Sequence, residues 1–421
     1  MIPNMKNFED LKAQQLLPPE AYTSQEWFER EKDELFGKTW SFACLEKDIP
    51  EVGDYITVQV GNYPLVVLRD RELNVRVFHN ICRHRGAKIL EGTGNCKTGL
   101  KCRYHYWMFN LDGSVRGIPQ KDVLFSDCDK ANLGLKQASM GVFKGMVFVN
   151  PQAEPDQSFD QWLDGIKDDA WEEIGDEVVV ALEINYEVQA NWKLVFENAN
   201  DGYHLSYLHE HTLGGPLTNH QKTVSYGLHS CYQGSNQYYA EILKKGNTTL
   251  AQTLYAAMDK KALKEATADV APEDYEEFTG GHDLYFMFPN VVVSSGALGF
   301  MYFQIIPVAP NKTISKFRFF TPPGYEKDYY KANNILMPNP GVKTRVGVNE
   351  KPIKLSEVEG GFDSKNFQVE DMWICEQMQQ GLKSPAYEAG PYAPGTGEGP
   401  ITFFQANVLS FMDKEKLNEV I

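Results

Sequence analysis

Two short segments of the chain each carry a cysteine followed closely by a histidine: Cys82 with His84 and, after seventeen intervening residues, Cys102 with His105. Two thiolates and two imidazoles on two tight turns can converge on a tetrahedral zinc ion. They can also hold a [2Fe–2S] cluster, with both cysteines on one iron and both histidines on the other. The Cys-x-His spacing is shorter than the usual zinc-finger spacings, so we expect the cluster, with a zinc-binding scaffold as the alternative.

A second group of candidate ligands lies between residues 191 and 212, which read NWKLVFENANDGYHLSYLHEHT. This segment places Asp201, His204 and His209 within nine residues. Two histidines and one distant carboxylate are the ligand set of a reactive iron(II) site that keeps positions open for dioxygen. The alternative is a helix whose histidines only make hydrogen bonds.

Helical geometry limits how this segment can bind a single ion. At about 100° per residue, Glu197, Asp201 and His204 share one helix face, whereas His209 is rotated by about 140° from His204. We therefore expect the helix to bulge or end between the two histidines. His211 is the weaker candidate, because it would need an undistorted helix past His209.

The third ligand is expected from an acidic residue far along the chain. Residues 367–382, FQVEDMWICEQMQQGL, predict a helix closed by Gly381. Glu370 and Asp371 are adjacent there, and spacing alone does not choose between them. Asp371 falls one turn from Cys375 on a mostly apolar face, where a carboxylate must be paired or bound to a metal.

The elements that must position these residues predict an α+β protein. The Cys/His segments lie among short strand signals punctuated by glycines, which predict a small all-β unit. The second group lies in a helix that can cover an antiparallel sheet. A Pro-containing acidic run near residue 155 indicates a linker. We predict an N-terminal helical segment (1–39), an all-β domain (40–155) and a catalytic domain (156–421). Strands are expected at 55–60, 64–69, 73–79, 107–115, 142–149, 177–188, 284–288, 290–294, 299–308 and 314–320, with an exposed helix at 250–279.

Charge and composition exclude several classes of partner. The net charge of −16 argues against nucleic acid or an anionic membrane. The chain has no run of roughly 18 apolar residues and no secretory signal at its start. Seven cysteines, an odd number in a large chain, fit a reducing compartment. We expect a cytoplasmic protein.

The two Cys/His segments, CRHRGAKILEG and CRYHYWMFNLDGSVRGIP, resemble the Rieske motif of the large (α) subunit of aromatic-ring-hydroxylating oxygenases. The ligand spacing, the Arg-Gly pair after the first histidine, Trp107 and Gly113 all match. Tyr106 departs from the family, which commonly has glycine after the second ligand histidine. Respiratory Rieske proteins have an extra cysteine after each ligand pair, and Ala87 and Tyr104 stand in those places here.

The resemblance extends to the second group of ligands. NWKLVFENANDGYHLSYLH is similar to the family's D-x2-H-x4-H motif, which implies that His204 and His209 are iron ligands. It also implies that Asp201 hydrogen-bonds His204 and reaches the cluster ligand His105 of a neighbouring subunit. A carboxylate between two metal-bound imidazoles fixes both tautomers and offers a short electron path.

The helix at 367–382 resembles the family pattern E-D-x4-E-x2-Q-x-G-L. In that pattern the second acid is the ligand, which implies that Asp371 completes the iron site and that Glu370 is structural. The resemblance covers most of the chain, from about Trp40 to Phe411.

By this resemblance the protein is a Rieske non-haem iron oxygenase with a helix-grip-like catalytic domain, a Rieske [2Fe–2S] cluster and a mononuclear Fe(II). The chain shows no Gly-rich dinucleotide fingerprint, so electrons are expected from an NAD(P)H-linked reductase, with or without a ferredoxin. The family also implies a homotrimer, with or without a small β subunit.

The substrate is expected to be an aromatic compound, in particular an aromatic acid, that the enzyme mono- or cis-dihydroxylates. This expectation rests on Asp201, because the quaternary-amine branch of the family often has glutamate at that position. The alternative is a monooxygenase that demethylates a quaternary amine or an aryl ether. A non-enzymatic alternative is a Rieske electron-transfer protein, which needs no second metal site.

Overall fold

The structure is a computed structural model of the 421-residue chain, and it describes residues 12–168, 178–210, 212, 222–233, 283–296, 299–321, 323, 351–395 and 397–420. The predicted helix at 250–279 lies outside these ranges, as does the weaker ligand candidate His211. The chain forms two compact units, one of residues 29–176 and one that joins residues 1–28 to residues 177–421.

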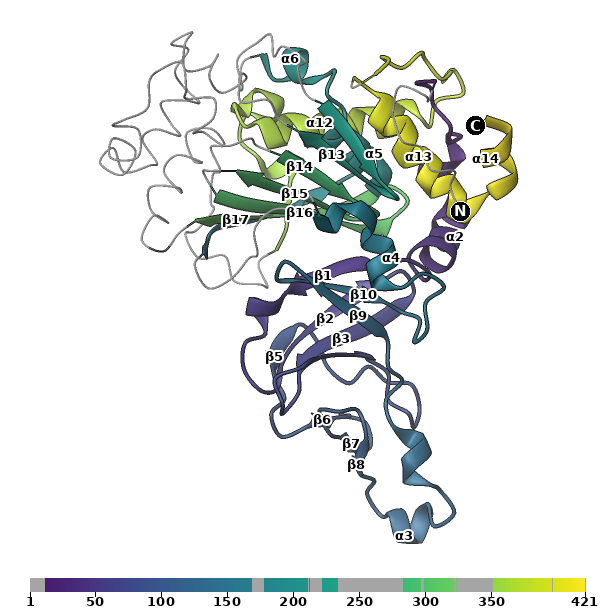
Figure 1. The fold of residues 1–421 in the computed structure, drawn as a ribbon, viewed down its shortest axis with the longest axis vertical. Helices are drawn as coiled ribbons and strands as arrows, with labels where there is room; N and C mark the ends of the chain where they lie inside the picture. Colours follow the sequence, from purple (N-terminus) through teal and green to yellow (C-terminus); the bar gives the residue numbers. More distant parts are fainter. Residues whose placement is uncertain are drawn as a thin grey trace. The chain divides into compact units, whose positions relative to one another are not determined.

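The unit of residues 29–176 contains three small antiparallel sheets (Figure 1). Their strand orders are β1-β10-β9 (Ser41–Leu45, Met146–Asn150, Ser139–Phe143), β4-β3-β2-β5 (Val75–His79, Tyr63–Arg69, Asp54–Val60, Thr93–Asn95) and β6-β7-β8 (Leu100–Lys101, Met108–Phe109, Val115–Gly117). The strand predicted at 142–149 is a hairpin, because Lys144 and Gly145 both have positive φ, at 51° and 76°.

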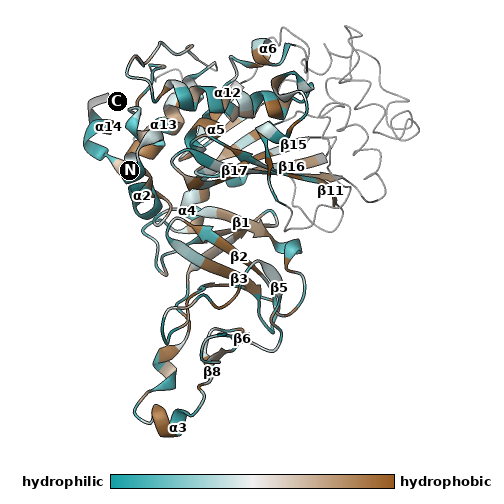
Figure 2. Ribbon diagram, turned by 180° about the vertical axis from the view of Figure 1, so that it is seen from behind, coloured by the Kyte–Doolittle hydropathy of each residue, from teal (hydrophilic) through white to brown (hydrophobic). Residues whose placement is uncertain are grey.

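The linker predicted near residue 155 lies within this unit. Helix α4 (Phe159–Leu163) buries Trp162, whose ring lies 5.1 Å from that of Phe148 on β10. The indole of Trp40 donates a hydrogen bond to the carbonyl oxygen of Gln157. These contacts join residues 156–168 to the all-β unit. Short helix α3 (Lys121–Leu124) exposes the hydrophobic side chains of Val123 and Leu124. Part of its ribbon has the hydrophobic colour in Figure 2.

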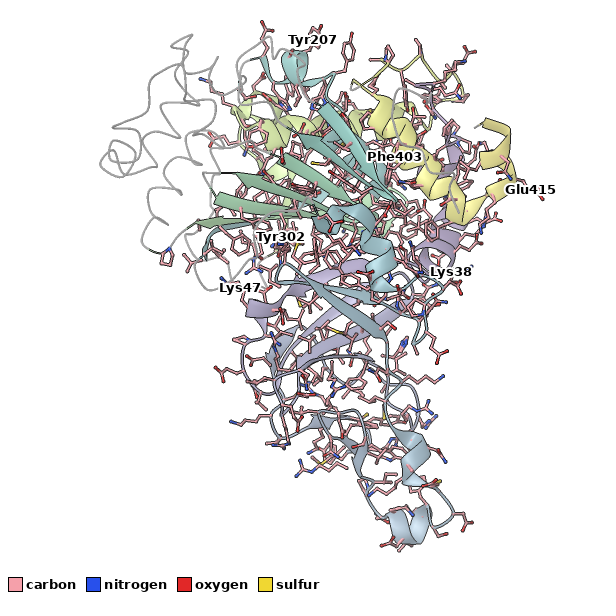
Figure 3. All side chains as sticks on the ribbon, in the orientation of Figure 1. Lys38, Lys47, Tyr207, Tyr302, Phe403 and Glu415 are labelled. Atoms are coloured by element: carbon pink, nitrogen blue, oxygen red, sulfur yellow. The ribbon has the colours of Figure 1, made fainter. Side chains whose placement is uncertain are left out.

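The second unit is organised around an eight-stranded sheet. The order is β12-β13-β14-β15-β16-β17-β11-β18 (Lys222–Tyr226, His229–Gln233, Asp283–Met287, Val291–Gly296, Gly299–Ala309, Lys312–Thr321, Val179–Val188, Ile353–Lys354). All pairs are antiparallel except β11 with β18. Glu183, Arg318 and Tyr302 face one another across three strands: Arg318 Nε lies 3.0 Å from Glu183 Oε2, and Arg318 Nη1 donates to Tyr302. Tyr302 is labelled in Figure 3.

Helices α5 (Trp192–Ala199) and α12 (Phe367–Gly381) pack on each other and against strands β11, β16 and β17 (Figure 1). Helix α13 (Gly399–Met412) packs on α5, with the rings of Phe404 and Phe196 stacked 4.4 Å apart. Residues 1–28 belong to this unit, with short helix α1 (Glu20–Thr23). Within the described residues, each helix is too short or too polar to span a membrane. The predicted α+β class is confirmed, with an antiparallel sheet covered by helices.

Candidate metal centres

The segment after α5 turns sharply at Asp201. The carboxylate oxygen Oδ1 of Asp201 accepts hydrogen bonds from the backbone N–H groups of Tyr203, at 2.7 Å, and His204, at 3.3 Å. Such side-chain acceptors compete with helical hydrogen bonds, so α5 ends at Ala199. The expectation that one helix runs through His204 is therefore wrong.

His204 and His209 lie at the two ends of helix α6 (Leu205–Leu208). The predicted interruption between the two histidines is confirmed, because the helix ends at Leu208 and His209 follows with φ −100° and ψ 20°. This short helix turns both imidazoles towards the same point.

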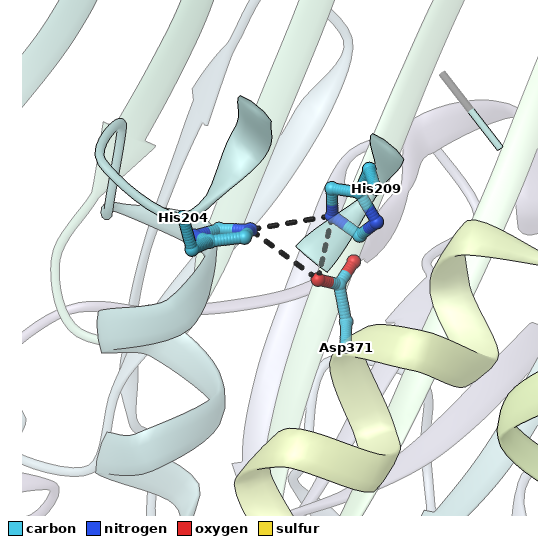
Figure 4. A group of neighbouring side chains, drawn as sticks. All are labelled: His204, His209 and Asp371. Atoms are coloured by element: carbon cyan, nitrogen blue, oxygen red, sulfur yellow. Dashed lines mark hydrogen bonds and ion pairs between the residues drawn. The ribbon is translucent and has the colours of Figure 1, made fainter. Parts of the chain in front are cut away.

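Asp371 of α12 meets the two histidines there (Figure 4). Its Oδ1 lies 3.1 Å from His209 Nε2 and 3.5 Å from His204 Nε2, and the two Nε2 atoms are 3.3 Å apart. We call His204, His209 and Asp371 the ligand triad. Among the described residues, it is the group of three Cys, His, Asp or Glu ligand atoms that lie within 4.8 Å of one another.

The outer nitrogen of each imidazole faces a second carboxylate. His209 Nδ1 donates to Glu370 Oε2 at 2.7 Å, and His204 Nδ1 lies 3.2 Å from Asp201 Oδ2. A proton on Nδ1 leaves a lone pair on Nε2, so two lone pairs and a carboxylate oxygen face one point. Asp371 Oδ1 is buried without a hydrogen bond of normal geometry. The triad therefore fits a divalent metal ion with two histidines and one carboxylate.

The charges of the triad are strongly coupled. Burial alone would raise the pKa of Asp371, but the imidazoles of His209 and His204 hold it well below its usual range. Burial alone would lower the histidine pKa values, but Asp201 and Asp371 raise that of His204 to about 10. Asp371 and Glu370 raise that of His209 to about 9. The site thus attracts positive charge, from a metal or from protons.

Glu370 and Thr212 extend this arrangement. Sequence reasoning placed Glu370 only as a structural acid, whereas the structure places it directly on His209. Thr212 Oγ1 donates to the same Glu370 oxygen at 2.7 Å, which no sequence signal indicated. His229 is buried, and its Nδ1 accepts from the backbone N–H of Phe288, so it lies apart from the triad.

The two Cys/His segments form loops of the same backbone design. In each loop the N–H of the cysteine donates to the carbonyl five residues later, and its own carbonyl accepts from the N–H four residues later. That fourth residue is left-handed in both loops: Gly86 has φ 72° and Tyr106 has φ 58°. We call residues 82–87 and 102–107 the cluster loops. The glycine common in the family at the Tyr106 position fits this conformation.

The cluster loops bring like ligands together. Cys82 and Cys102 are buried in the hydrophobic core, and burial together with the adjacent Cys102 thiol raises the pKa of Cys82. His84 Nδ1 lies 3.1 Å from His105 Nδ1. The His84 ring stacks on Trp107, with a centroid separation of 5.0 Å.

The way in which these four ligands pair distinguishes a two-iron cluster from a single zinc ion. In a tetrahedral zinc site, bonds of roughly 2.0–2.3 Å place all four ligand atoms roughly 3.3–3.8 Å apart. In the part of the chain that the structure describes, only the ligand triad gathers three such atoms within 4.8 Å. The cluster loops therefore present a sulfur pair and a nitrogen pair, as a [2Fe–2S] cluster with two histidine ligands requires. All seven cysteines are free thiols.

Comparison with known families agrees with this geometry. Residues 39–128 match the Rieske [2Fe-2S] domain, and residues 175–414 match the ring hydroxylating alpha subunit (catalytic domain). The chain belongs to the Rieske oxygenase large subunits. Its Rieske domain binds a [2Fe–2S] cluster, its catalytic domain binds a mononuclear iron, and the protein is an oxygenase.

Relatives of this oxygenase act on different substrates. A glycine betaine monooxygenase oxygenase subunit of Chromohalobacter salexigens is 25% identical over 95% of this chain and 87% of its own length. The anthranilate 1,2-dioxygenase large subunit of Acinetobacter baylyi is 32% identical over 45% of this chain and 41% of its own.

Solved structures share the fold of this oxygenase. The quaternary ammonium Rieske monooxygenase CntA with L-carnitine has a TM-score of 0.68 and 19% identity, covering 96% of this chain and 97% of that one. Naphthalene 1,2-dioxygenase from a Rhodococcus species, bound to indole, has a TM-score of 0.68 and 18% identity, covering 95% of this chain and 94% of that one.

Proposed function

We propose that this chain is the terminal oxygenase that hydroxylates an aromatic acid, with the mononuclear iron held by the ligand triad and the [2Fe–2S] cluster held by Cys82, His84, Cys102 and His105. The observation that carries this proposal is the convergence of two imidazole Nε2 atoms and one buried carboxylate oxygen on a single point. An electron-transfer protein needs no such second site.

Iron(II) bound by the triad would supply electrons and open coordination positions for dioxygen. The surrounding residues fix the geometry: Glu370 and Asp201 hold the outer nitrogens of the two imidazoles, so each Nε2 stays directed inward. Monooxygenation consumes the substrate, O2, two electrons and two protons and yields one hydroxyl group and one water. Cis-dihydroxylation consumes the same reactants and places both oxygen atoms on the ring.

The electrons must come from another protein, since the sequence has no dinucleotide fingerprint. We propose an NAD(P)H-linked reductase as the donor. An exposed, imidazole-ligated cluster suits this transfer, because histidine ligation raises its potential above that of a plant-type ferredoxin.

We also propose that the oxygenase is a homotrimer in which His105 of one chain meets Asp201 of the next. His105 is exposed, and Asp201 is only partly buried. A head-to-tail contact of this kind forms a ring when the rotation between neighbouring subunits closes, as a trimer requires. Chains carrying Asp201→Asn and chains carrying Cys102→Ser should each be inactive, but mixed trimers of the two should regain turnover. Mixed trimers without turnover would place the electron path within one chain.

A quaternary ammonium compound is the second candidate substrate. Its support is the near full-length match to the glycine betaine monooxygenase subunit, whereas the match to the anthranilate dioxygenase of Acinetobacter covers less than half of either chain. The support for an aromatic acid is Asp201, in place of the glutamate common in the quaternary-amine branch.

The two candidates leave different products. The purified oxygenase, a surrogate reductase and NADH should be supplied with aromatic acids and with methylammonium compounds under labelled dioxygen. An aromatic substrate gains one or two labelled oxygen atoms, whereas N-demethylation releases formaldehyde. Labelled ring hydroxyls support our proposal, and formaldehyde from a methylammonium compound replaces it with the second candidate.

A further inference from the structure

A buried carboxylate lies one helical turn before Asp201. Glu197 is in the last turn of α5 and is 6% exposed. Lys193, one turn earlier on the same helix face, is fully buried. Ionisable side chains are rarely buried without partners, so this face of α5 must be matched by polar groups from its neighbours.

Those partners come from both ends of the chain. Tyr22, in helix α1, donates its hydroxyl to Glu197 Oε1 at 2.7 Å. Gln405 of α13 donates its Nε2 to the same oxygen at 3.1 Å and also contacts the Tyr22 hydroxyl at 3.0 Å. The ammonium of Lys193 lies 5.3 Å from the centre of the Tyr22 ring.

The segment around Tyr22 is tied to helices α5, α12 and α13. The carbonyl oxygen of Tyr22 accepts from Asn191, the N-cap of α5, and from Gln379 of α12. Gln405 Oε1 accepts from the backbone N–H groups of Leu16 and Leu17. Residues 14–23 are therefore an integral part of the catalytic unit.

The position of α5 is transmitted directly to Asp201. The N–H of Asp201 donates to the carbonyl of Asn198 in the last turn of α5. Asp201 in turn bonds the backbone N–H of His204 and faces its imidazole. Any rotation of α5 therefore moves the carboxylate that fixes His204.

We propose that Glu197 is a positioning residue, which Tyr22 and Gln405 hold so that α5 keeps the rotation that presents Asp201 to His204. This inference rests on the proposed function of Asp201 and His204. Burial raises the pKa of Glu197 to about 7, although Tyr22, Gln405 and Lys193 oppose the shift.

The size of the effect follows from helix geometry. A side-chain tip about 5–6 Å from the helix axis moves by about 1 Å when the helix rotates by about 10°. A misplacement of about 1 Å at a reacting centre can cost about 100-fold in rate. Tyr22→Phe removes the donor hydroxyl, and Glu197→Leu removes the acceptor oxygen that glutamine would keep. Because neither variant removes a ligand, both should keep iron and cluster.

We expect each variant to slow oxidation of the reduced cluster by dioxygen, with substrate bound, by at least about 10-fold. The double variant should be no slower than the slower single variant, because both act through one contact. The rate of amide hydrogen exchange at residues 200–209, measured by mass spectrometry, should rise in both variants. A less ordered Asp201 carboxylate would hold the backbone N–H groups of Tyr203 and His204 less firmly.

Tyr387→Phe is the matched control. It removes a tyrosine hydroxyl that donates to Gln15 of the same N-terminal segment, but it does not touch Glu197. This variant should keep the parent rate and the parent exchange. If Glu197→Leu does not fold, Tyr22→Phe decides by the same measurements, because it removes one hydrogen bond and no charge.

The positioning role would be overturned if Tyr22→Phe oxidised its cluster and exchanged its amide hydrogens at the rates of the parent protein. It would also be overturned if Tyr22→Phe and Tyr387→Phe lost the same fraction of the cluster oxidation rate. Failure of the proposed function is distinguishable, since the parent oxygenase itself would then show no substrate-dependent oxidation of its cluster. The exchange measurement does not depend on turnover.

Discussion

Asp371 and Glu370 are adjacent on α12, but their side chains make different contacts. Measurements of metal affinity in variants can therefore distinguish their roles. Asp371 faces both Nε2 atoms, whereas Glu370 accepts from His209 Nδ1 at 2.7 Å. Glu370→Gln weakens one charge-assisted hydrogen bond, worth about 1.5–3 kcal/mol. At about 1.4 kcal/mol per factor of ten, metal affinity should fall by about 10- to 150-fold. Outer partners of metal-bound histidines typically contribute about 10- to 100-fold.

Asp371→Ala should have a larger effect, because it removes one of three ligands and the only anionic one. We expect this variant to lose mononuclear iron while the cluster absorbance stays at the parent level. The measurement is anaerobic titration with Fe(II) or Co(II) against a chelator of known affinity, with iron and sulfide analysis of the cluster.

Glu376→Gln is the matched control on the same helix. Its carboxylate accepts from the backbone N–H of Gln189, away from the triad, so metal affinity should be unchanged. Full iron in Asp371→Ala, together with loss in Glu370→Gln, would refute the assignment and make Glu370 the ligand.

Three further perturbations test other parts of the molecule. Asp201→Asn should keep both metals and stop turnover, and hydroxylation at the parent rate would remove its bridging role. The folded protein holds a proton on Glu197 that the unfolded chain releases, because burial raises the pKa from 4.5 to about 7. The free energy of unfolding should therefore fall by about 3 kcal/mol as the pH rises from about 4.5 to above 7. Chemical denaturation at a series of pH values should show this fall in the parent protein but not in Glu197→Gln. Tyr106→Gly should be about 1 kcal/mol more stable than Tyr106→Ala, because position 106 has φ 58°; equal midpoints of unfolding would contradict the left-handed turn.

Spacing along the chain predicted that His204 and His209 meet, but not how the backbone brings them together. A rotation of about 140° between His204 and His209 required an interruption, and the structure has one at Leu208. The earlier end of α5 was not predictable from periodicity, because it depends on Asp201 accepting two local backbone N–H groups.

Long-range partners were the least predictable part of the site. Tyr22 lies 175 residues from Glu197, and neither helical nor strand periodicity connects them. The choice between Glu370 and Asp371 likewise needed the orientation of α12, since adjacent helical residues differ by about 100° in direction. The cluster loops were easier to predict from the sequence, because the ligands of each loop are close together in the chain. Each loop also requires a left-handed residue at a fixed position.

The two histidines of the triad differ in access to solvent, and this difference bears on where we propose that an electron enters. The side chain of Glu370, behind His209, is 5% exposed, whereas that of Asp201, behind His204, is 16% exposed. Asp201 is followed by exposed Tyr203, and Tyr207 extends from the surface of α6 (Figure 3).

The cluster loops show the same asymmetry. His84 packs against Trp107 and the edge of Phe125, whereas His105 is exposed and covered on one face by Tyr104, 3.7 Å away between ring centres. Each centre thus has one histidine that is more enclosed and one that is more exposed. An electron that passes between proteins must use the accessible member of each pair, because transfer through the enclosed member adds distance through packed side chains. The greater exposure of His105 and Asp201 supports our proposal that they are the two ends of the path, independently of any sequence motif.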